Sequence, residues 1–300
     1  MDRFDNGVQI TMIRKIFTLI MFSGLVALSG CQTQPMGNSV AFSRLTGDYW
    51  QVWTMQPDGG QAEQVTTSSA DKRYPVWATN GQQLYFRTNN NLSFNVNLDT
   101  EQETRVLGSL GSNDGVVPSP DGSKLLLVRF SSQLKDNANL WLTSSEGKGR
   151  RILTRDAGLQ YNPCWSPDSG QIAYICGYGY RTDELYIIDS DGKNKYRLTN
   201  NKAIELLPAF SPDGSSIAYV SDVTGNFEIW LMAPDGTNRK QLTDSEGIDT
   251  RPSWSPDGSK IMFASNRSGQ LQIWIMNSDG SSPQQITTGA PSMDPAWKRK

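Results

Sequence analysis

The stretch PSWSPDGSKIMF, from Pro252 to Phe263, decides the fold because its parts return along the chain. Close copies are PAFSPDGSSIAYV at 208–220 and PCWSPDSGQIAYI at 163–175, and looser copies begin at residues 75 and 116. Proline presets the turn backbone, while Asp and Gly tolerate the remaining turn positions. β-Branched and aromatic residues on both sides favour strands. Each copy therefore predicts a strand, a tight turn and a second strand.

Three further positions recur six times at fixed spacing. An aromatic residue is followed five positions later by an acid, and eight positions after that by a residue that is Thr in five units. The aromatics are Trp53, Phe94, Trp141, Tyr186, Trp230 and Trp274, and the acids are Asp58, Asp99, Glu146, Asp191, Asp235 and Asp279. Four-strand units with a period of about 40–45 residues are typical of propeller blades. We expect an all-β, six-bladed β-propeller of four-stranded blades over residues 39–300.

The two ends of this region complement one another. The last residues, Asp294 to Lys300, read DPAWKRK, so a new unit begins and stops after its tryptophan. The first unit starts at Ser39 with VAFSR and lacks such a strand. We expect the C-terminal strand to pair into the N-terminal blade and close the ring, which removes the exposed sheet edge.

The unit P-x-W-S-P-D-G, I-W-x-M-x-x-D-G, Q-L-T resembles the TolB-like β-propeller repeat family over Ser39 to Trp297. The resemblance implies a domain that docks other proteins of the bacterial cell envelope, including the peptidoglycan-associated lipoprotein. Two departures lead us to expect a stand-alone propeller lipoprotein rather than the protein that names the family. There is no room for an α/β domain ahead of the propeller, and the N-terminus carries a lipidation motif.

Residues 1–31 read as a targeting segment. Arg14 and Lys15 precede an apolar run from Ile16 to Leu28, as in a secretory signal peptide. The run is short for a membrane span, although an uncleaved anchor helix is the alternative. Leu28 to Cys31 (LSGC) resembles a bacterial lipobox, which implies acylation of Cys31 and membrane attachment through its acyl chains. Residues 32–38 would form a short tether.

In lipoproteins of this kind, Gln32 favours the outer membrane, so we expect the propeller to face the periplasm. Asp2 and Asp5 are unusual in a signal peptide, which leaves open whether translation starts at Met1 or Met12.

The composition excludes several activities. The chain has no histidine, which rules out Ser–His and Cys–His catalytic pairs and the commonest zinc ligand. A net charge of −2 gives no general affinity for nucleic acid. We therefore expect a monomeric non-enzyme without a cofactor.

Several recurring residues have a structural explanation. The turn aspartates, such as Asp257, suit turns better than calcium loops. The recurring aromatics suit packing between blades. Cys164 should face residue 173, so that Cys176 lies about 10 Å further along, beyond disulfide reach. Both cysteines are expected to be buried free thiols.

The residues just before each first strand should crowd one mouth of the central channel, where a partner would bind. They are Lys72, Arg73, Asn113, Asp114, Gln160, Tyr161, Glu205, Asp249, Arg251 and Asp294. A loop on the same face carries Tyr178, Tyr180 and Arg181, residue types that are frequent in interface hot spots. Ordinary solvated loop charges and a tyrosine packed on its own blade are the alternatives.

The main functional hypothesis is a membrane-anchored module that binds a protein or peptide of the cell envelope. One alternative is a carbohydrate-active enzyme that uses two of Asp114, Glu205, Asp249 and Asp294 as paired acids. Another is a structural cation, such as calcium, held in the channel by the same acids.

Overall fold

A computed structural model describes residues 40–106, 113–130, 137–179 and 182–299. The chain divides into two units, residues 1–35 and 36–300, and only the second contains described residues. The expected signal peptide, Cys31, the tether, Tyr180 and Arg181 lie outside the described residues. Within the described ranges, no helix is long and apolar enough to cross a membrane.

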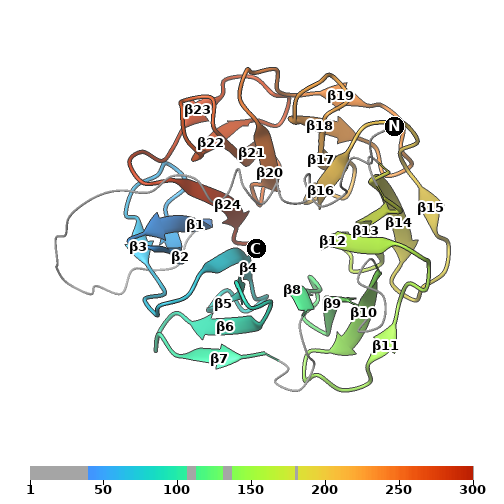
Figure 1. Cartoon of the computed structure of the whole chain (residues 1–300), viewed down its shortest axis with the longest axis horizontal. Helices are drawn as coiled ribbons and strands as arrows, with labels where there is room; N and C mark the ends of the chain where they lie inside the picture. The colour runs from blue at the N-terminus through green and yellow to red at the C-terminus, as the bar shows by residue number, and fades with distance from the viewer. Residues whose placement is uncertain (1–39, 107–112, 131–136, 180–181, 300) are drawn as a thin grey trace, which may run out of the picture. The chain divides into compact units, whose positions relative to one another are not determined.

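The fold is an all-β propeller (Figure 1). Four sheets have four strands each, and their strands are β24 (Ser292–Trp297), β1 (Val40–Thr46), β2 (Tyr49–Met55) and β3 (Glu63–Gln64); β4 (Lys72–Trp77), β5 (Gln83–Thr88), β6 (Ser93–Asn97) and β7 (Glu103–Arg105); β16 (Glu205–Phe210), β17 (Ile217–Ser221), β18 (Glu228–Met232) and β19 (Lys240–Gln241); and β20 (Asp249–Trp254), β21 (Lys260–Ser265), β22 (Gln272–Asn277) and β23 (Gln284–Gln285).

The remaining strands form one eight-stranded sheet, where the sequence predicted two separate blades. Its strands are β8 (Asn113–Pro118), β9 (Lys124–Phe130), β10 (Ala138–Ser144), β11 (Arg151–Ile152), β12 (Leu159–Trp165), β13 (Gln171–Gly177), β14 (Glu184–Asp189) and β15 (Tyr196–Arg197). The strands pair antiparallel within β8–β11 and within β12–β15. One parallel bridge, between Ala138 of β10 and Leu159 of β12, joins the two groups.

The C-terminal strand pairs with the first described strand. β24 lies antiparallel to β1, with Trp297 opposite Val40 and Ser292 opposite Arg44. In Figure 1 the red β24 lies beside the blue β1 near the centre of the ring. The strand that starts the last repeat therefore belongs to the same sheet as the first repeat.

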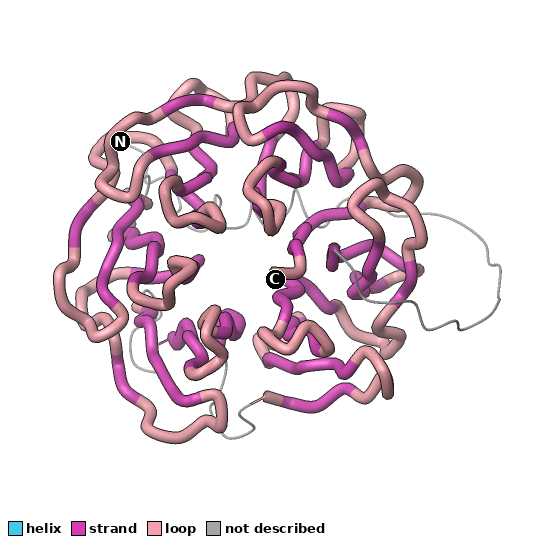
Figure 2. The backbone as a smooth tube through the Cα atoms, turned by 180° about the vertical axis from the view of Figure 1, so that it is seen from behind, coloured by secondary structure: helices cyan, strands magenta, loops and turns pink. Residues whose placement is uncertain are grey.

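The innermost strand carries the P-x-W motif in four of the six four-strand groups, while β16 has P-A-F and β8 has V-V-P at this point. Figure 1 places β4, β8, β12, β16, β20 and β24 innermost, and Figure 2 shows the same ring from behind. The motif tryptophan donates its indole N–H to the innermost strand of the preceding group. The three such bonds are Trp77 to the Ala296 carbonyl (3.0 Å), Trp165 to that of Val117 (3.1 Å) and Trp254 to that of Ala209 (3.0 Å). The tryptophan thus fastens each of these three groups to its neighbour.

The threonine of the Q-L-T motif satisfies a buried backbone donor. In five units its hydroxyl accepts the N–H of the residue just before the recurring aromatic. The threonines are Thr66, Thr154, Thr199, Thr243 and Thr287, at 2.8–3.0 Å. A buried N–H without a partner is costly, so this bond gives a physical reason for the fixed spacing between the aromatic and the threonine.

The core lies between neighbouring sheets and confirms the predicted role of the aromatics. One cluster joins Phe42 of the first sheet to Met262 and Ile273 of the last, with Trp53 packed against it. The other five recurring aromatics also pack against apolar clusters. The turn aspartates accept bonds from their own turns, as in Ser255 to Asp257 (2.6 Å), which confirms the prediction for these turns.

A β-bulge interrupts each innermost strand, and in every one except β8 it begins just before the proline. Between Arg73 and Val76, for example, two residues of β4 face one of β5. The residue at the bulge has positive φ in all six strands: Tyr74, Gly115, Asn162, Leu207, Arg251 and Asp294. Such backbone is unusual for residues other than glycine. A bulge changes the direction of the side chain at this position relative to the rest of the strand.

Candidate functional site

Bulge residues from three sheets meet at the centre of the ring. Tyr74 belongs to β4, Arg251 to β20 and Asp294 to β24. The Arg251 guanidinium lies over the Tyr74 ring, 4.4 Å from its centroid. The sheet of β24 and β1 packs against both the β20 sheet and the β4 sheet. The contact between Arg251 and Tyr74 therefore joins two sheets that lie on either side of it.

Asp294 holds two of the arginines at this point. Its Oδ2 accepts from Arg73 Nε at 3.0 Å, and its Oδ1 lies 2.5 Å from Arg251 Nε. The backbone N–H of Tyr74 also donates to Oδ2, at 3.3 Å. Burial alone would raise the pKa of Asp294, but Arg251 and Arg73 outweigh it and lower the pKa to about 2. The carboxylate is therefore charged at every physiological pH.

The ring of Tyr74 is surrounded by guanidinium groups. Arg87 lies 4.6 Å and Arg73 5.0 Å from its centroid, in addition to Arg251. Burial raises the pKa of the Tyr74 hydroxyl, but the nearby Arg73 and Arg251 reverse this and lower it below its usual value. We call Arg73, Tyr74, Arg87, Arg251 and Asp294 the arginine cluster. Tyrosine and arginine are the residue types that dominate binding energy at protein interfaces.

Five of the predicted mouth residues are buried, contrary to expectation: Asp294, which is 5% exposed, belongs to the arginine cluster, and the other four lie between sheets. Lys72, Gln160, Glu205 and Asp249 lie at or next to the first position of an innermost strand and are at most 1% exposed. Sequence reasoning placed them in connectors. The structure uses them as polar links to the preceding four-strand group, as when Lys72 Nζ donates to Gln51 Oε1 of β2 at 3.3 Å.

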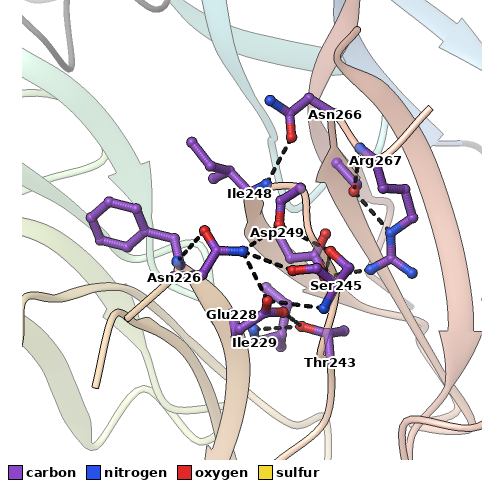
Figure 3. A network of polar contacts seen from close by, with 12 residues as sticks. Asn226, Glu228, Ile229, Thr243, Ser245, Ile248, Asp249, Asn266 and Arg267 are labelled. Carbon is purple, nitrogen blue, oxygen red and sulfur yellow. Dashed lines mark hydrogen bonds and ion pairs between the residues drawn. The ribbon is translucent and has the colours of Figure 1, made fainter. Parts of the chain in front are cut away.

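The link at Asp249 is shown in Figure 3. Asp249 accepts a bond from Arg267, and its neighbour Glu228 accepts from Thr243 (2.6 Å) and Asn226 (3.0 Å). Burial, together with the nearby Asp249, raises the pKa of Glu228 against the effect of these hydrogen bonds. Ser245, which follows β19, donates to Asp249 of β20 at 3.4 Å, so this buried carboxyl group contacts the preceding sheet and is not available to a partner.

The other predicted residues fall in three places. Asn113 and Asp114 begin β8, but their side chains lie outside the described part of the structure. Tyr161 is half-buried, and its hydroxyl donates to Asp183 at 2.7 Å. Tyr178 is 57% exposed and lines a small pocket with Glu184 and Tyr186.

Sequence reasoning missed Tyr74 and Arg87, the aromatic centre of the cluster and one of its arginines. Tyr74 precedes the proline of the motif, as Arg251 and Asp294 do. Comparison of the repeats at this one position would have identified it. Arg87 lies on β5 and is brought to the cluster only by strand pairing, opposite Arg73.

Metal binding and cysteine pairing were the two remaining possibilities for this part of the chain. Among the described residues, no group of three or more His, Cys, Asp or Glu side chains could hold a metal ion. Cys164 pairs with Ala173, as predicted, and both Cys164 and Cys176 are free thiols. Cys176 is buried and Cys164 half-buried.

Comparison with known sequences supports the fold. Residues 147–299 match the family described as TolB beta propeller domain. A curated relative, the Tol-Pal system protein TolB of Anaeromyxobacter dehalogenans, is 28% identical over 119 residues. The match covers 39% of this chain and 26% of the relative, so the chain spans about a quarter of that relative's length.

Two solved structures have a similar fold. TolB from Acinetobacter baumannii has a TM-score of 0.76 at 20% identity, covering 88% of this chain and 67% of the other. A putative TolB from Agrobacterium tumefaciens has a TM-score of 0.73 at 22% identity, covering 87% of this chain and 92% of the other. At these identities the likeness concerns the fold alone.

Proposed function

Because the chain belongs to the TolB beta propeller domain family, we propose that it is a protein-binding module of the bacterial cell envelope. The arginine cluster would be its main contact. The single observation that carries this proposal is the convergence of Arg73, Tyr74 and Arg251 at the centre of the ring. Arg73 and Arg251 keep 13% and 16% of their side chains exposed, so a partner can reach them.

The cluster suits an acidic or aromatic segment of a partner. Guanidinium groups bind carboxylates through paired hydrogen bonds and stack on aromatic rings. Asp294 and the tyrosine ring hold the arginines in place before binding, which lowers the entropy lost on association. One candidate partner is the peptidoglycan-associated lipoprotein, because the curated relative is a Tol-Pal system protein.

We also propose that the eight-stranded sheet acts as two blades, so that the module is a closed six-bladed ring. Its two antiparallel groups are joined by a single bridge. The Trp165 bond to Val117 links these groups as Trp254 links two separate sheets. The pairing of β24 with β1 would hold the first and last repeats together.

Attachment to the outer membrane through an acylated Cys31 is a further part of the proposal. It rests on the LSGC motif and Gln32 alone. Metabolic labelling with a fatty acid tests it: the parent chain should take up label, and a Cys31→Ala chain should take up none.

The alternative of a carbohydrate-active enzyme is less well supported by the contacts. Asp294 is paired with two arginines, Asp249 with Arg267, and Glu205 accepts a bond from Asn201 at 2.8 Å. All three carboxyl groups are buried, so a sugar could not reach them without a rearrangement.

The proposal is tested by photo-crosslinking in intact cells with two variants taken from sister repeats. Arg251→Asn and Tyr74→Leu introduce residues found at the same bulge in Asn162 and Leu207, so the backbone should tolerate them. Loss of a hot-spot residue should reduce capture of the partner at least tenfold.

The control is Arg150→Gln, at an exposed position on the outer hairpin. Asp249 is unsuitable as a probe because it is fully buried. Melting curves should show that all variants fold. Equal crosslinking by the parent and both cluster variants would reject the site.

A further inference from the structure

A small pocket lies beside β14 and β15, next to the loop that joins β13 to β14. Tyr178, Thr182, Glu184, Tyr186, Arg197 and Asn201 line a partly open pocket of about 200 Å³. A site for a drug-sized ligand is larger, about 300–1,000 Å³. The pocket therefore fits the end of one side chain, and we call it the Glu184 pocket.

Glu184 differs from its counterparts in the sister repeats. The residue two before the recurring aromatic is Gln51, Glu228 and Gln272 in three other units. Each of them accepts the hydroxyl proton of its Q-L-T threonine, at 2.6–2.8 Å. Glu184 instead uses Oε1 to accept from Arg197 (2.7 Å) and from the Asn201 N–H (2.9 Å). Its buried Oε2 has no hydrogen-bond donor among the described residues.

Arg197 is the cause of this difference. Its counterparts Gln64, Gln241 and Gln285 donate only to the threonine carbonyl two residues on, each at 2.7 Å. Arg197 makes the same bond through Nε, at 2.7 Å, and its longer side chain also reaches Glu184. One carboxylate oxygen is thereby occupied, and the other, although buried, is left without a donor among the described residues. A buried acceptor without a donor is costly, and binding of a donor would remove that cost.

Two tyrosines complete the pocket. One face of Tyr186 is stacked on Tyr174, with 5.8 Å between ring centroids, which fixes its orientation. Tyr178 is 57% exposed at the rim. Tyrosine faces attract cations, and a carboxylate within the same pocket adds a direct hydrogen-bonded contact.

We propose that the Glu184 pocket binds the ammonium group of a lysine side chain from a partner protein. Lysine is favoured over arginine by geometry. A guanidinium binds a carboxylate most strongly through a planar fork to both oxygens, but Arg197 and Asn201 already occupy Oε1. An ammonium is a compact donor that can direct one of its three N–H groups to a single oxygen. The site extends the proposed protein-binding function but shares no residue with the arginine cluster.

The experiment titrates the purified full chain with Nα-acetyl-lysine methylamide and follows the shifts by NMR. Nα-acetyl-norleucine methylamide, which has a similar stem without the charge, and the arginine analogue are the comparison ligands. We expect weak binding of the lysine probe and at least fivefold weaker binding of both others, because each lacks a compact ammonium donor.

Two variants change the pocket charge in opposite directions. Glu184→Gln should abolish lysine binding, and Arg197→Gln should strengthen it about fivefold by freeing the carboxylate. Both introduce residues that sister repeats carry at these positions, so the fold should survive. Tyr196→Ala, at an exposed residue that does not line the pocket, should bind as the parent does.

The proposal is overturned if the parent fails to bind the lysine probe, or if norleucine or arginine probes bind as well. It is also overturned if Glu184→Gln retains binding, or if Arg197→Gln weakens it. The probe represents a single lysine side chain of a partner and would bind only at the Glu184 pocket. These outcomes therefore do not depend on the arginine cluster. Loss of partner capture by Arg251→Asn would still stand on its own.

Discussion

Replacement of Glu205 by glutamine should stabilise the protein at alkaline pH and have little effect at acid pH. Glu205 is 1% exposed and accepts a hydrogen bond from Asn201 at Oε1, while its Oε2 has no hydrogen-bond donor among the described residues. Burial, reinforced by the nearby Glu184, raises its pKa from 4.5 to about 7, against the lowering effects of Asn201 and Ser221. The folded protein therefore prefers the neutral carboxyl.

The sign follows from proton binding. Below pH 4.5 both the folded and the unfolded chain hold this proton, so Glu205 has no effect on the pH dependence. Between 4.5 and about 7 the folded chain binds more protons, so stability falls as the pH rises. Each pH unit contributes about 1.4 kcal/mol, so the full cost above pH 7 is about 3 kcal/mol.

Urea denaturation from pH 4 to pH 8.5 measures the effect as the difference between parent and variant. Glutamine can still accept the Asn201 bond, and it removes the titrating group. The free energy of unfolding of Glu205→Gln should be close to the parent's at pH 4 and about 2–3 kcal/mol higher at pH 8. Use of the difference cancels the contribution of Glu228, whose pKa is also raised.

Glu146→Gln is the matched control, because Glu146 is 70% exposed and its substitution should change the free energy of unfolding little. A parent–variant difference at Glu205 that stays constant across the range would refute the reasoning. So would a variant that is less stable than the parent at pH 8.

Two further predictions concern the ring and the thiols. Deletion of residues 294–300 removes most of β24, the partner of β1, so the cooperative thermal transition should be lost; a truncated chain that melts like the parent would show that this pairing is dispensable. Burial raises the pKa of Cys164 to about 12 and raises that of Cys176 as well, so neither thiol should react with iodoacetamide at pH 8 until the chain is unfolded in urea. Peptide mass spectrometry measures the labelling, and a failure of both to react after unfolding without reductant would indicate a disulfide instead.

The sequence was sufficient for the parts of the fold that depend on local chemistry. Turn residues, alternating strands and fixed spacings act over a few positions. The same pattern occurs in several repeats, so each copy supports the structure assigned to the others. The strand order within each group, the role of the turn aspartates and the pairing of β24 with β1 could therefore be predicted. The separation of Cys164 from Cys176 followed from the same local register.

Sheet boundaries were harder to predict. The repeat pattern does not predict the parallel bridge between Ala138 and Leu159. A single backbone contact of this kind depends on how closely two neighbouring four-strand groups approach each other.

The candidate sites were decided by the tertiary structure. Tyr74 and Arg251 are far apart in the chain, and they meet because a bulge turns both side chains inward from different sheets. Asp249 and Arg251 are two positions apart, yet one is buried in a sheet-to-sheet link and the other lies in the arginine cluster. The sequence by itself determined the repeating unit, because local conformational preferences act within each copy. Only the packing of the copies against one another decided which charges are buried, paired or exposed, because these depend on contacts between groups distant in sequence.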